Sequence, residues 1–342
     1  MTSFVESNPE LESYWRVIIL LGRNSASYKF ALAQTLLGLD KNRSTFSLDE
    51  LAEPYAKKIC RHLELADRQG TSTSSKFLSV CRDFNNGNAS QDELIKGTVS
   101  LGFANVIDAF HIVNQEETQE RFFIDDRKNS NGIILTDELF KIREQAQFGN
   151  LLPEVEARWR LVETAWDLGI SPNLLQVTFD ETSLGLYVPV DTSRRVDITS
   201  SRDALNGYQK GKCFYCGKDI SIEISSQNLA DIDHFFPHIL KEFDEFSVVN
   251  IDGVWNLVLS CVSCNRGPDG KFARVPEVVY LERLYRRNEY LISSHHPLRE
   301  TLINQTGKSA ALRRQFLQLM DRMAINHLIH RWSAFERAPS TL

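Results

Sequence analysis

The chain has 342 residues, of which 42% are hydrophobic and 25% are charged, a composition typical of globular proteins and unlike that of disordered chains. This length allows two or three domains. The chain does not open with a basic stretch followed by an apolar run, and its longest aliphatic run, VIILL, is far too short to span a bilayer, so we expect a cytoplasmic protein with no membrane partner.

The formal net charge of −6 is unevenly distributed along the chain. From Arg266 to the end, 13 Lys or Arg stand against 7 Asp or Glu, whereas the preceding residues hold 26 basic and 38 acidic side chains. This asymmetry predicts either a basic C-terminal face that meets phosphate or a set of solvated helix faces.

The first 170 residues are predicted to be mainly helical. The stretches ESYWRVIILLGRN and SASYKFALAQTLLGL indicate two helices separated at Gly22–Asn24 and stopped at Gly38. Ser47 and Glu50 have the spacing of a capping box and predict the start of a third helix.

A further helix is predicted over PEVEARWRLVETAWDLG. Pro153 stands where a first helical turn tolerates proline, and Gly169 follows the expected end. Trp159, Val162 and Trp166 fall on one face at helical spacing, so we expect them in the core.

The pattern changes near residue 175. The stretch VTFDETSLGLYVPV predicts a β-hairpin, and SSRDALNGYQKGKC predicts a short helix that leads into the first cysteine pair. Beyond Pro276 the sequence predicts helices again, in EVVYLERLYRRNEYLI and SAALRRQFLQLMDRMAINHLIHRW.

Four of the six cysteines form two Cys-x-x-Cys pairs: Cys213, Cys216, Cys261 and Cys264. In a chain with no recognisable secretion signal, such pairs indicate a metal site rather than disulfides. Four thiolates fill the coordination sphere of Zn²⁺, so this zinc would be structural and would contribute about 10 kcal/mol to folding. Cys60 and Cys81 stand alone in helical surroundings and are expected to be buried thiols.

Between the two cysteine pairs, the stretch DIDHFFPH at 231–238 brings together two carboxylates and two imidazoles. Hydrolysis of a phosphodiester bond needs an activated water and positive charge at the phosphate. Because histidine ordinarily titrates near neutral pH, His234 is the candidate general base. Neighbouring side chains on a strand point to opposite faces, so Asp233 faces away from His234 and is the candidate ligand of a cation. Asp231 would support the metal indirectly, through contact with its ligands.

Asn265 directly follows the second cysteine pair, where a helix should begin. Its amide oxygen is a second hard ligand, and the combination of carboxylate and amide oxygens favours Mg²⁺ or Mn²⁺ over softer metals. We therefore expect Asp233 and Asn265 to hold Mg²⁺ or Mn²⁺.

These motifs resemble the HNH endonuclease superfamily. They are D-x-D-H-x-x-P at 231–237, N-L-x-x-x-C from Asn256, and N-R-G from Asn265 followed by V-P at 275–276. Similar motifs occur in the HNH domain of RNA-guided CRISPR effectors, which also carry Asn where many relatives have a final His. The resemblance covers residues 213–276 and implies a ββα-metal core with His234, Asn256 and Asn265 as the catalytic set, Asn256 tying the connecting loop.

Four side chains are candidates for nucleic-acid contact: Arg266, Lys271, Arg274 and His238. The first three follow Asn265 directly, so they are placed to bind backbone phosphates without regard to sequence. An ordinary solvated loop, and for His238 a solvent-facing residue after a strand-ending proline, explain the same pattern equally well.

We expect an α+β fold with three parts. Residues 1–195 form a mainly helical regulatory or partner-docking domain, 196–280 the HNH module with its structural zinc, and 281–342 a basic helical extension. The expected function is a metal-dependent endonuclease that cleaves DNA in a bacterial defence or restriction system. Expected partners are DNA and an ATPase or another subunit of that system; the oligomeric state stays open. The alternative is a zinc-ribbon nucleic-acid-binding or adaptor protein that has lost catalysis.

Overall fold

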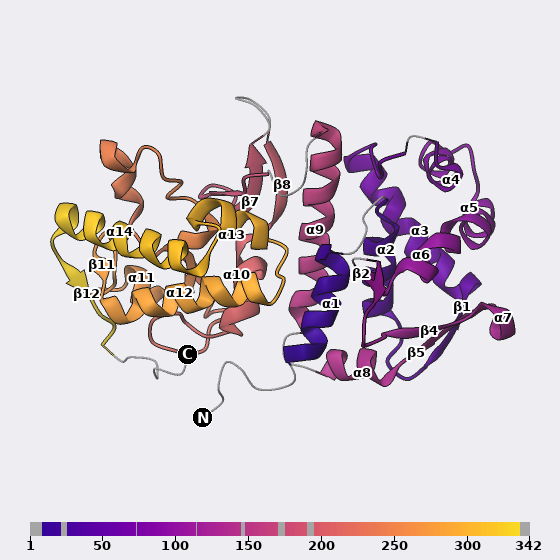
Figure 1. Ribbon diagram of the computed structural model, residues 1–342, viewed down its shortest axis with the longest axis horizontal. Helices are drawn as coiled ribbons and strands as arrows, with labels where there is room; N and C mark the ends of the chain where they lie inside the picture. Colours follow the sequence, from indigo (N-terminus) through magenta and orange to yellow (C-terminus); the bar gives the residue numbers. More distant parts are fainter. Residues whose placement is uncertain are drawn as a thin grey trace. The chain divides into compact units, whose positions relative to one another are not determined.

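The computed structural model describes residues 9–21, 26–72, 74–113, 115–144, 148–169, 175–189 and 195–335. They form two compact units, one within Ser7–Pro172 and the other within Asn173–Leu342 (Figure 1). Helices dominate and the strands form small sheets, so the predicted α+β class is confirmed. Among the residues listed above, no helix is both long enough and apolar enough to cross a bilayer.

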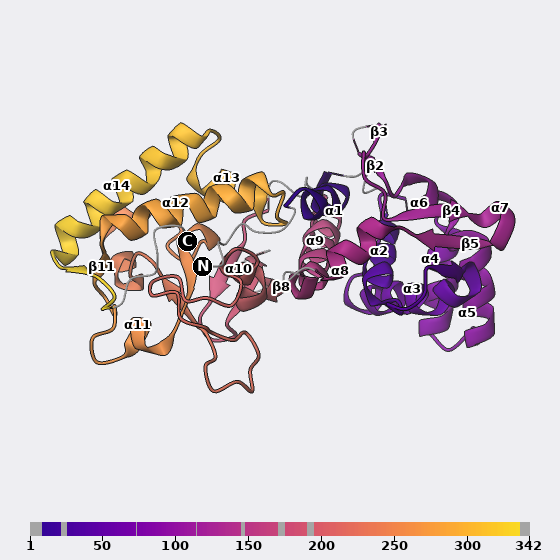
Figure 2. The ribbon, with the colours of Figure 1, turned by 90° about the horizontal axis from the view of Figure 1, so that it is seen from below.

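The N-terminal unit is mainly helical. Its helices are α1 (Pro9–Leu21), α2 (Tyr28–Gly38), α3 (Leu48–Leu65), α4 (Lys76–Asn85), α5 (Gln91–Gly97) with a π-helical turn (Thr98–Gly102), α6 (Ala104–Ala109), α7 (Arg127–Ser130), α8 (Asp137–Glu144) and α9 (Phe148–Leu168). Its strands are β1 (Thr45–Ser47), β2 (Ile112–Val113), β3 (Glu116–Glu117), β4 (Phe123–Asp126) and β5 (Gly132–Leu135). Helix α2 packs against α3 and α9 around a core of aliphatic and aromatic side chains (Figure 2). The antiparallel sheet β1-β5-β4, which the sequence did not predict, lies within this half.

The N-terminal helices begin and end largely as predicted. Helix α1 ends at Leu21 and α2 ends at Gly38, while the predicted break at Gly22–Asn24 lies outside the described residues. At the start of α3 the capping box is present: the Ser47 hydroxyl accepts from the Glu50 backbone N–H at 3.3 Å, and the Glu50 carboxylate accepts from the Ser47 N–H at 2.9 Å.

Helix α9 begins earlier than the sequence predicted. It starts at Phe148, so Pro153 lies inside the helix rather than in its first turn. Proline lacks the N–H that would bond the carbonyl of Gly149. Leu151 and Val155 on either side of it are buried, and their packing outweighs the lost bond.

The aromatic face of α9 is core, as predicted. Trp159, Val162 and Trp166 are buried, and the imidazole of His62 stacks on the indole of Trp159 with ring centroids 3.5 Å apart. The helix ends at Leu168, and Gly169 adopts a positive φ of 67°, a conformation that glycine enters without steric cost.

The C-terminal unit combines short strands with helices. Its strands are β6 (Thr178–Asp180), β7 (Gly185–Pro189), β8 (Arg195–Ser200), β9 (Asp231–His234), β10 (Leu257–Ser260), β11 (Val275–Pro276) and β12 (Arg331–Trp332). Its helices are α10 (Ser201–Gln209), α11 (Val262–Arg266), α12 (Val278–Ser293), α13 (Arg299–Thr306) and α14 (Ala310–Leu328), with 3-10 turns η3 (His238–Glu242), η4 (Asp244–Phe246) and η5 (Val254–Asn256). The predicted hairpin is present as β6–β7, and β8 extends it to a three-stranded antiparallel sheet.

The hairpin belongs to the C-terminal unit, so the division falls before residue 195, the boundary expected from the sequence. Thr178 forms a β-bridge with Gly253, and its hydroxyl accepts from the Asn250 amide at 3.1 Å. On the other side, the carbonyl of Val177 accepts from the Gln305 amide at 2.9 Å. These contacts hold the start of β6 against the segment that precedes β10.

The helices after residue 280 also belong to this unit. Arg287 of α12 is buried and donates to the carbonyls of Val254, Trp255 and Leu257 at 3.2, 3.2 and 2.7 Å. Helix α12 in turn packs against α13 and α14, and in Figure 2 these three helices lie on one side of the unit and α11 on the other. Residues 281–342 are therefore packed on the module rather than forming a separate extension.

Candidate active site

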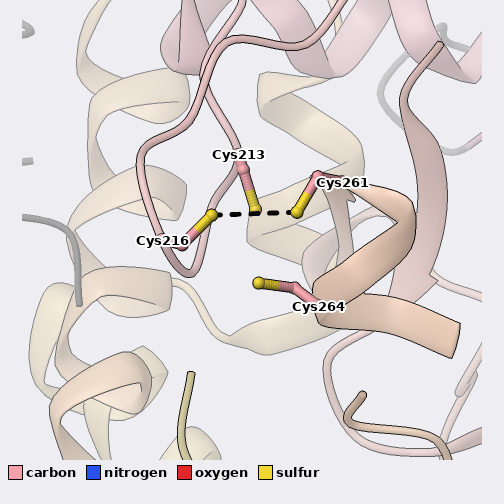
Figure 3. Close-up of side chains that lie close together, drawn as sticks. All are labelled: Cys213, Cys216, Cys261 and Cys264. Carbon is pink, nitrogen blue, oxygen red and sulfur yellow. Dashed lines mark hydrogen bonds between the residues drawn. The ribbon is translucent and has the colours of Figure 1, made fainter. Parts of the chain in front are cut away.

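Four cysteines meet at the base of the module (Figure 3): Cys213, Cys216, Cys261 and Cys264. Their sulfur atoms all lie within 4.8 Å of one another, and those of Cys216 and Cys261 are 3.7 Å apart. Four sulfurs placed about 2.3 Å from one Zn²⁺ at the corners of a tetrahedron would be separated by about 3.8 Å. The donors and their spacing therefore fit a tetrahedral zinc.

The local backbone explains how the two pairs meet. Gly217 closes the turn after Cys216 with φ of 74°, and its N–H donates to the carbonyl of Cys213 at 3.0 Å. The N–H of Phe214 donates to the carbonyl of Leu259 in β10 at 2.9 Å, which ties this turn to the sheet. Cys261 caps the N-terminus of α11, one turn before Cys264.

Hydrogen bonds among the four thiols shift their pKa values in opposite directions: the pKa of Cys213 and that of Cys264 are raised. Hydrogen bonds from the thiol of Cys213 and then from its neighbours hold the pKa of Cys261 well below its usual range. A thiolate is the form that binds a metal. The fit to zinc therefore rests on the four sulfur donors and their spacing.

Strands β9 and β10 and helix α11 form a ββα arrangement that gathers the candidate catalytic residues. The strands pair antiparallel, with His234 opposite Leu257 and Asp231 opposite Ser260. His234 ends β9, and Asn265 lies in α11, which follows β10 directly. The sequence motif and the ββα arrangement therefore agree.

The imidazole of His234 lies between an aspartate and an aromatic ring. Its Nε2 is 3.0 Å from Oδ1 of Asp252, and its Nδ1 is 3.8 Å from the nearest carboxylate oxygen of Glu181. The ring of Phe179 in β6 packs edge-on against it with centroids 5.6 Å apart. The hairpin β6–β7 thus forms one wall of the site.

Asp252 is a charged acceptor beside this imidazole. Its Oδ2 accepts from the ammonium of Lys241 at 2.6 Å. Burial acts to raise the pKa of Asp252, but the hydrogen bonds from His234 and Lys241 outweigh it and lower the pKa to about 2. Asp252 is therefore ionised at neutral pH.

Asp233, the predicted cation ligand, is buried and already paired. Its Oδ2 accepts from the hydroxyl of Tyr215 at 2.6 Å, and its Oδ1 lies 3.1 Å from the ammonium of Lys271. Burial raises the pKa of Asp233, while the charge of Lys271 and the hydrogen bond from Tyr215 act in the opposite direction. A cation at this carboxylate would have to share it with the Lys271 ammonium.

Asp231 lies closer to the predicted amide ligand than the sequence suggested. The Asn265 amide donates to Oδ2 of Asp231 at 3.2 Å, and the Arg266 guanidinium pairs with the same carboxylate at 2.9 Å. Rotation of the Asn265 amide would place its oxygen beside this carboxylate. Hard oxygen donors for Mg²⁺ or Mn²⁺ are thus present at Asp231 and Asn265.

We expect substitution of Asp231 to change the Mg²⁺ requirement of cleavage and substitution of Asp233 to change the stability of the protein. Asp231→Asn should leave thermal unfolding nearly unchanged and raise the Mg²⁺ concentration for half-maximal cleavage about 10- to 100-fold, because the side chain is partly exposed and meets the amide ligand. Asp233→Asn should destabilise the protein by about 3–5 kcal/mol, because it leaves the Lys271 ammonium buried without a counter-charge. Calorimetry and a Mg²⁺ titration measure the two effects; equal Tm shifts for both variants would contradict this assignment.

The side chain of Asn256 makes hydrogen bonds to backbone groups of the loop between β9 and β10. Its side chain is fully buried; Oδ1 accepts from the Phe236 N–H at 2.8 Å, and Nδ2 donates to the carbonyls of Phe236 and Ile251 at 2.9 Å each. The carbonyl of Asn256 accepts from the Phe235 N–H at 2.7 Å. Its contacts are those of a positioning residue that fixes the chain just after His234.

One of the side chains predicted to contact phosphate, Lys271, lies inside the module. Lys271 is fully buried, and its ammonium donates to the carbonyls of His234 and Phe272 at 2.9 and 3.1 Å, besides pairing with Asp233. A side chain held in this way cannot meet a phosphate at the surface. Its role is to tie the end of β9 to the loop after α11.

The other candidate contacts are nearer the surface. Arg266 is the most exposed of them, although it pairs with Asp231. Arg274 donates to the carbonyls of Asp269 and Gly270, and His238 lies beside Lys241, with 3.2 Å between Nε2 and Nζ.

The basic surplus of the C-terminal segment is partly internal. Arg283 and Arg287 are buried against backbone carbonyls, and burial lowers the pKa of Arg287 to about 9. Arg313 pairs with Glu289 and Arg331 with Asp321. Charge counted along the sequence therefore overstates the basic surface of this segment.

Sequence reasoning missed Asp252, Lys241 and Phe179. Asp252 and Lys241 lie within the matched motif region but at no spacing that singles them out, and Phe179 lies 55 residues before His234. The only signal in the sequence is the pair Asp252–Gly253 before Trp255, which is typical of a turn.

Strands β9 and β10, helix α11 and the four cysteines all lie between Cys213 and Arg266. The HNH endonuclease family matches residues 213–276, which coincide with this module. This segment has the sequence features of an HNH endonuclease domain, which points to a nuclease in general. Comparison with curated proteins and with solved structures found no match.

Proposed function

We propose that the protein is a metal-dependent endonuclease that hydrolyses phosphodiester bonds of DNA. The observation that carries the proposal is the placement of His234 at the end of β9, with no hydrogen bond to its Nδ1 from the described residues and with the Asn265-bearing helix following the paired strand. The HNH match over residues 213–276 supports the same reaction class.

The chemistry follows from the side chains present. His234 takes a proton from a water molecule, whose oxygen forms a bond to phosphorus as the bond from phosphorus to the leaving 3′ oxygen breaks. Loss of the proton makes the water a better nucleophile. Phe179 and Asp252 hold the imidazole on two sides, so its orientation is set before substrate arrives.

The residues that would hold Mg²⁺ or Mn²⁺ are Asn265 and a carboxylate of β9. Asp233 is the ligand proposed from the sequence, and Asp231 is the carboxylate that contacts Asn265. When bound, the ion supplies positive charge for the phosphate and the leaving oxygen. The four-cysteine cluster would hold a separate structural Zn²⁺.

The proposed biological role is that of a nuclease in a bacterial defence or restriction system, acting in the cytoplasm. An ATPase or another subunit of such a system is the proposed partner, and the acidic, mainly helical N-terminal unit is the proposed docking part. Exposed Arg266 near Asn265 is the proposed phosphate contact on DNA.

Removal of divalent metal is expected to stop cleavage. Purified protein is incubated with supercoiled plasmid in Mg²⁺ or Mn²⁺, with EDTA, and with EDTA followed by excess Mg²⁺. We expect cleavage in the first condition, none in the second and recovery in the third, because a structural zinc in a closed thiolate site exchanges slowly while the hard ion is lost at once. Cleavage that continues unchanged in EDTA would rule out the hard-metal assignment.

A further inference from the structure

The side chain of Asp252 connects an imidazole to an ammonium. Oδ1 lies 3.0 Å from Nε2 of His234, and Oδ2 accepts from Nζ of Lys241 at 2.6 Å. The Asp252 side chain is only 15% exposed, so water competes weakly for these two contacts. Nε2 of His238 also lies 3.5 Å from Oδ1, farther than Nε2 of His234, so the shorter contact of Oδ1 is with His234.

This arrangement determines where the proton of the imidazole resides. An ionised carboxylate only accepts hydrogen bonds, so Nε2 of His234 must carry the hydrogen. In the neutral imidazole the lone pair is then on Nδ1. Within the described part of the chain, the nearest carboxylate oxygen comes from Glu181 and is 3.8 Å from Nδ1, beyond hydrogen-bond distance.

The backbone holds Asp252 in this place. Its carbonyl accepts from the N–H of Phe179 in β6 at 3.0 Å. The next residue must be glycine, because a Cβ on Gly253 would lie 2.6 Å from the indole of Trp255. Asp252 is therefore fixed by the hairpin on one side and by a tight turn on the other.

We propose that Asp252 is a positioning residue that fixes the Nε2–H tautomer of His234 and makes Nδ1 the atom that takes the proton from the attacking water. This inference rests on the proposed function and deepens it. The water proton moves to Nδ1, the water oxygen bonds to phosphorus, and the leaving oxygen takes a proton from solvent. The imidazolium is stabilised by the Asp252 carboxylate until it returns its proton to solvent.

The tautomer can be observed without any cleavage. Protein labelled with ¹⁵N-histidine is recorded at about pH 8, where an ordinary histidine is neutral, and the His234 signals are identified by their loss in His234→Gln. We expect Nε2–H in the wild type and a shift toward the Nδ1–H form in Asp252→Asn. Asp244→Asn, an exposed aspartate in the same connecting segment, is the matched control and should leave the tautomer unchanged.

Activity supplies the second readout. Asp252→Asn should lower kcat about 10²-fold or more and leave DNA affinity, zinc content and Tm close to wild type, whereas Asp252→Glu should recover part of kcat because it restores a carboxylate. An Nδ1–H tautomer in the wild type, or the same tautomer in Asp252→Asn, would overturn the proposal. A wild-type protein that shows the Nε2–H form, loses it in Asp252→Asn, and cleaves no DNA would support the positioning role while contradicting the proposed nuclease function.

Discussion

Cys261→Ser is expected to unfold the HNH module rather than merely slow cleavage. Cys261 supplies one of four sulfurs and directly precedes α11, the helix that carries Asn265. A structural zinc in a four-thiolate site contributes about 10 kcal/mol of apparent folding free energy, which is as large as the whole stability of a typical domain. Loss of one ligand therefore removes the contact that holds the two ends of the module together.

The measurement combines metal analysis with limited proteolysis. Protein purified without added zinc should contain about one zinc per chain, and Cys261→Ser should contain almost none and be cut within residues 213–276. The matched control is Cys60→Ser, which removes a buried thiol in the N-terminal unit and should retain its zinc. A wild-type preparation that is folded and free of zinc would contradict the structural role of the cluster.

His234→Ala is expected to lower the cleavage rate about 10²- to 10⁴-fold, the usual loss when a positioned base is removed. The imidazole makes a hydrogen bond to Asp252, yet strand β9 is held mainly by its pairing with β10 and by the buried Lys271 ammonium. The module should therefore remain folded in this variant, with the same zinc content as the wild type.

His330→Ala is the control for loss of a histidine, because His330 is exposed in the same unit. It should cleave at the wild-type rate. If His234→Ala cleaves as fast as His330→Ala, His234 has no part in the mechanism.

The parts of the site that could be predicted are those encoded by short spacing. The spacing within each Cys-x-x-Cys pair places its two sulfurs close together, and the sulfurs of all four cysteines lie within 4.8 Å of one another. The positions of His234 at the end of a strand and of Asn265 in the following helix were predictable for a similar reason, because each belongs to a recognisable motif. The positions of these residues within their strands, turns and helices follow from local sequence, without knowledge of tertiary contacts.

The parts of the site that could not be predicted depend on how deeply a side chain is buried and on contacts between segments far apart in the sequence. Lys271 carries the charge expected of a phosphate contact, but the loop turns inward and buries its ammonium against the carbonyl of His234. Asp252 and Phe179 reach His234 only because β6 bridges to Gly253, a pairing between segments far apart in the sequence. No spacing rule connects such segments. Which of the two aspartates, Asp231 or Asp233, contacts Asn265 is likewise a matter of tertiary structure, and it is Asp231.

The central claim, that this chain is a metal-dependent DNA endonuclease acting through His234, is tested most directly by measuring cleavage and binding of the same plasmid in parallel. Wild type and His234→Ala are compared at fixed salt in Mg²⁺, alone and with the proposed partner subunit present. We predict that the wild type converts supercoiled plasmid to nicked or linear product, and that His234→Ala binds it with equal affinity but leaves it intact, because phosphate contacts do not depend on the base. Binding by both proteins with cleavage by neither, even with the partner, would contradict the claim and leave a nucleic-acid-binding module.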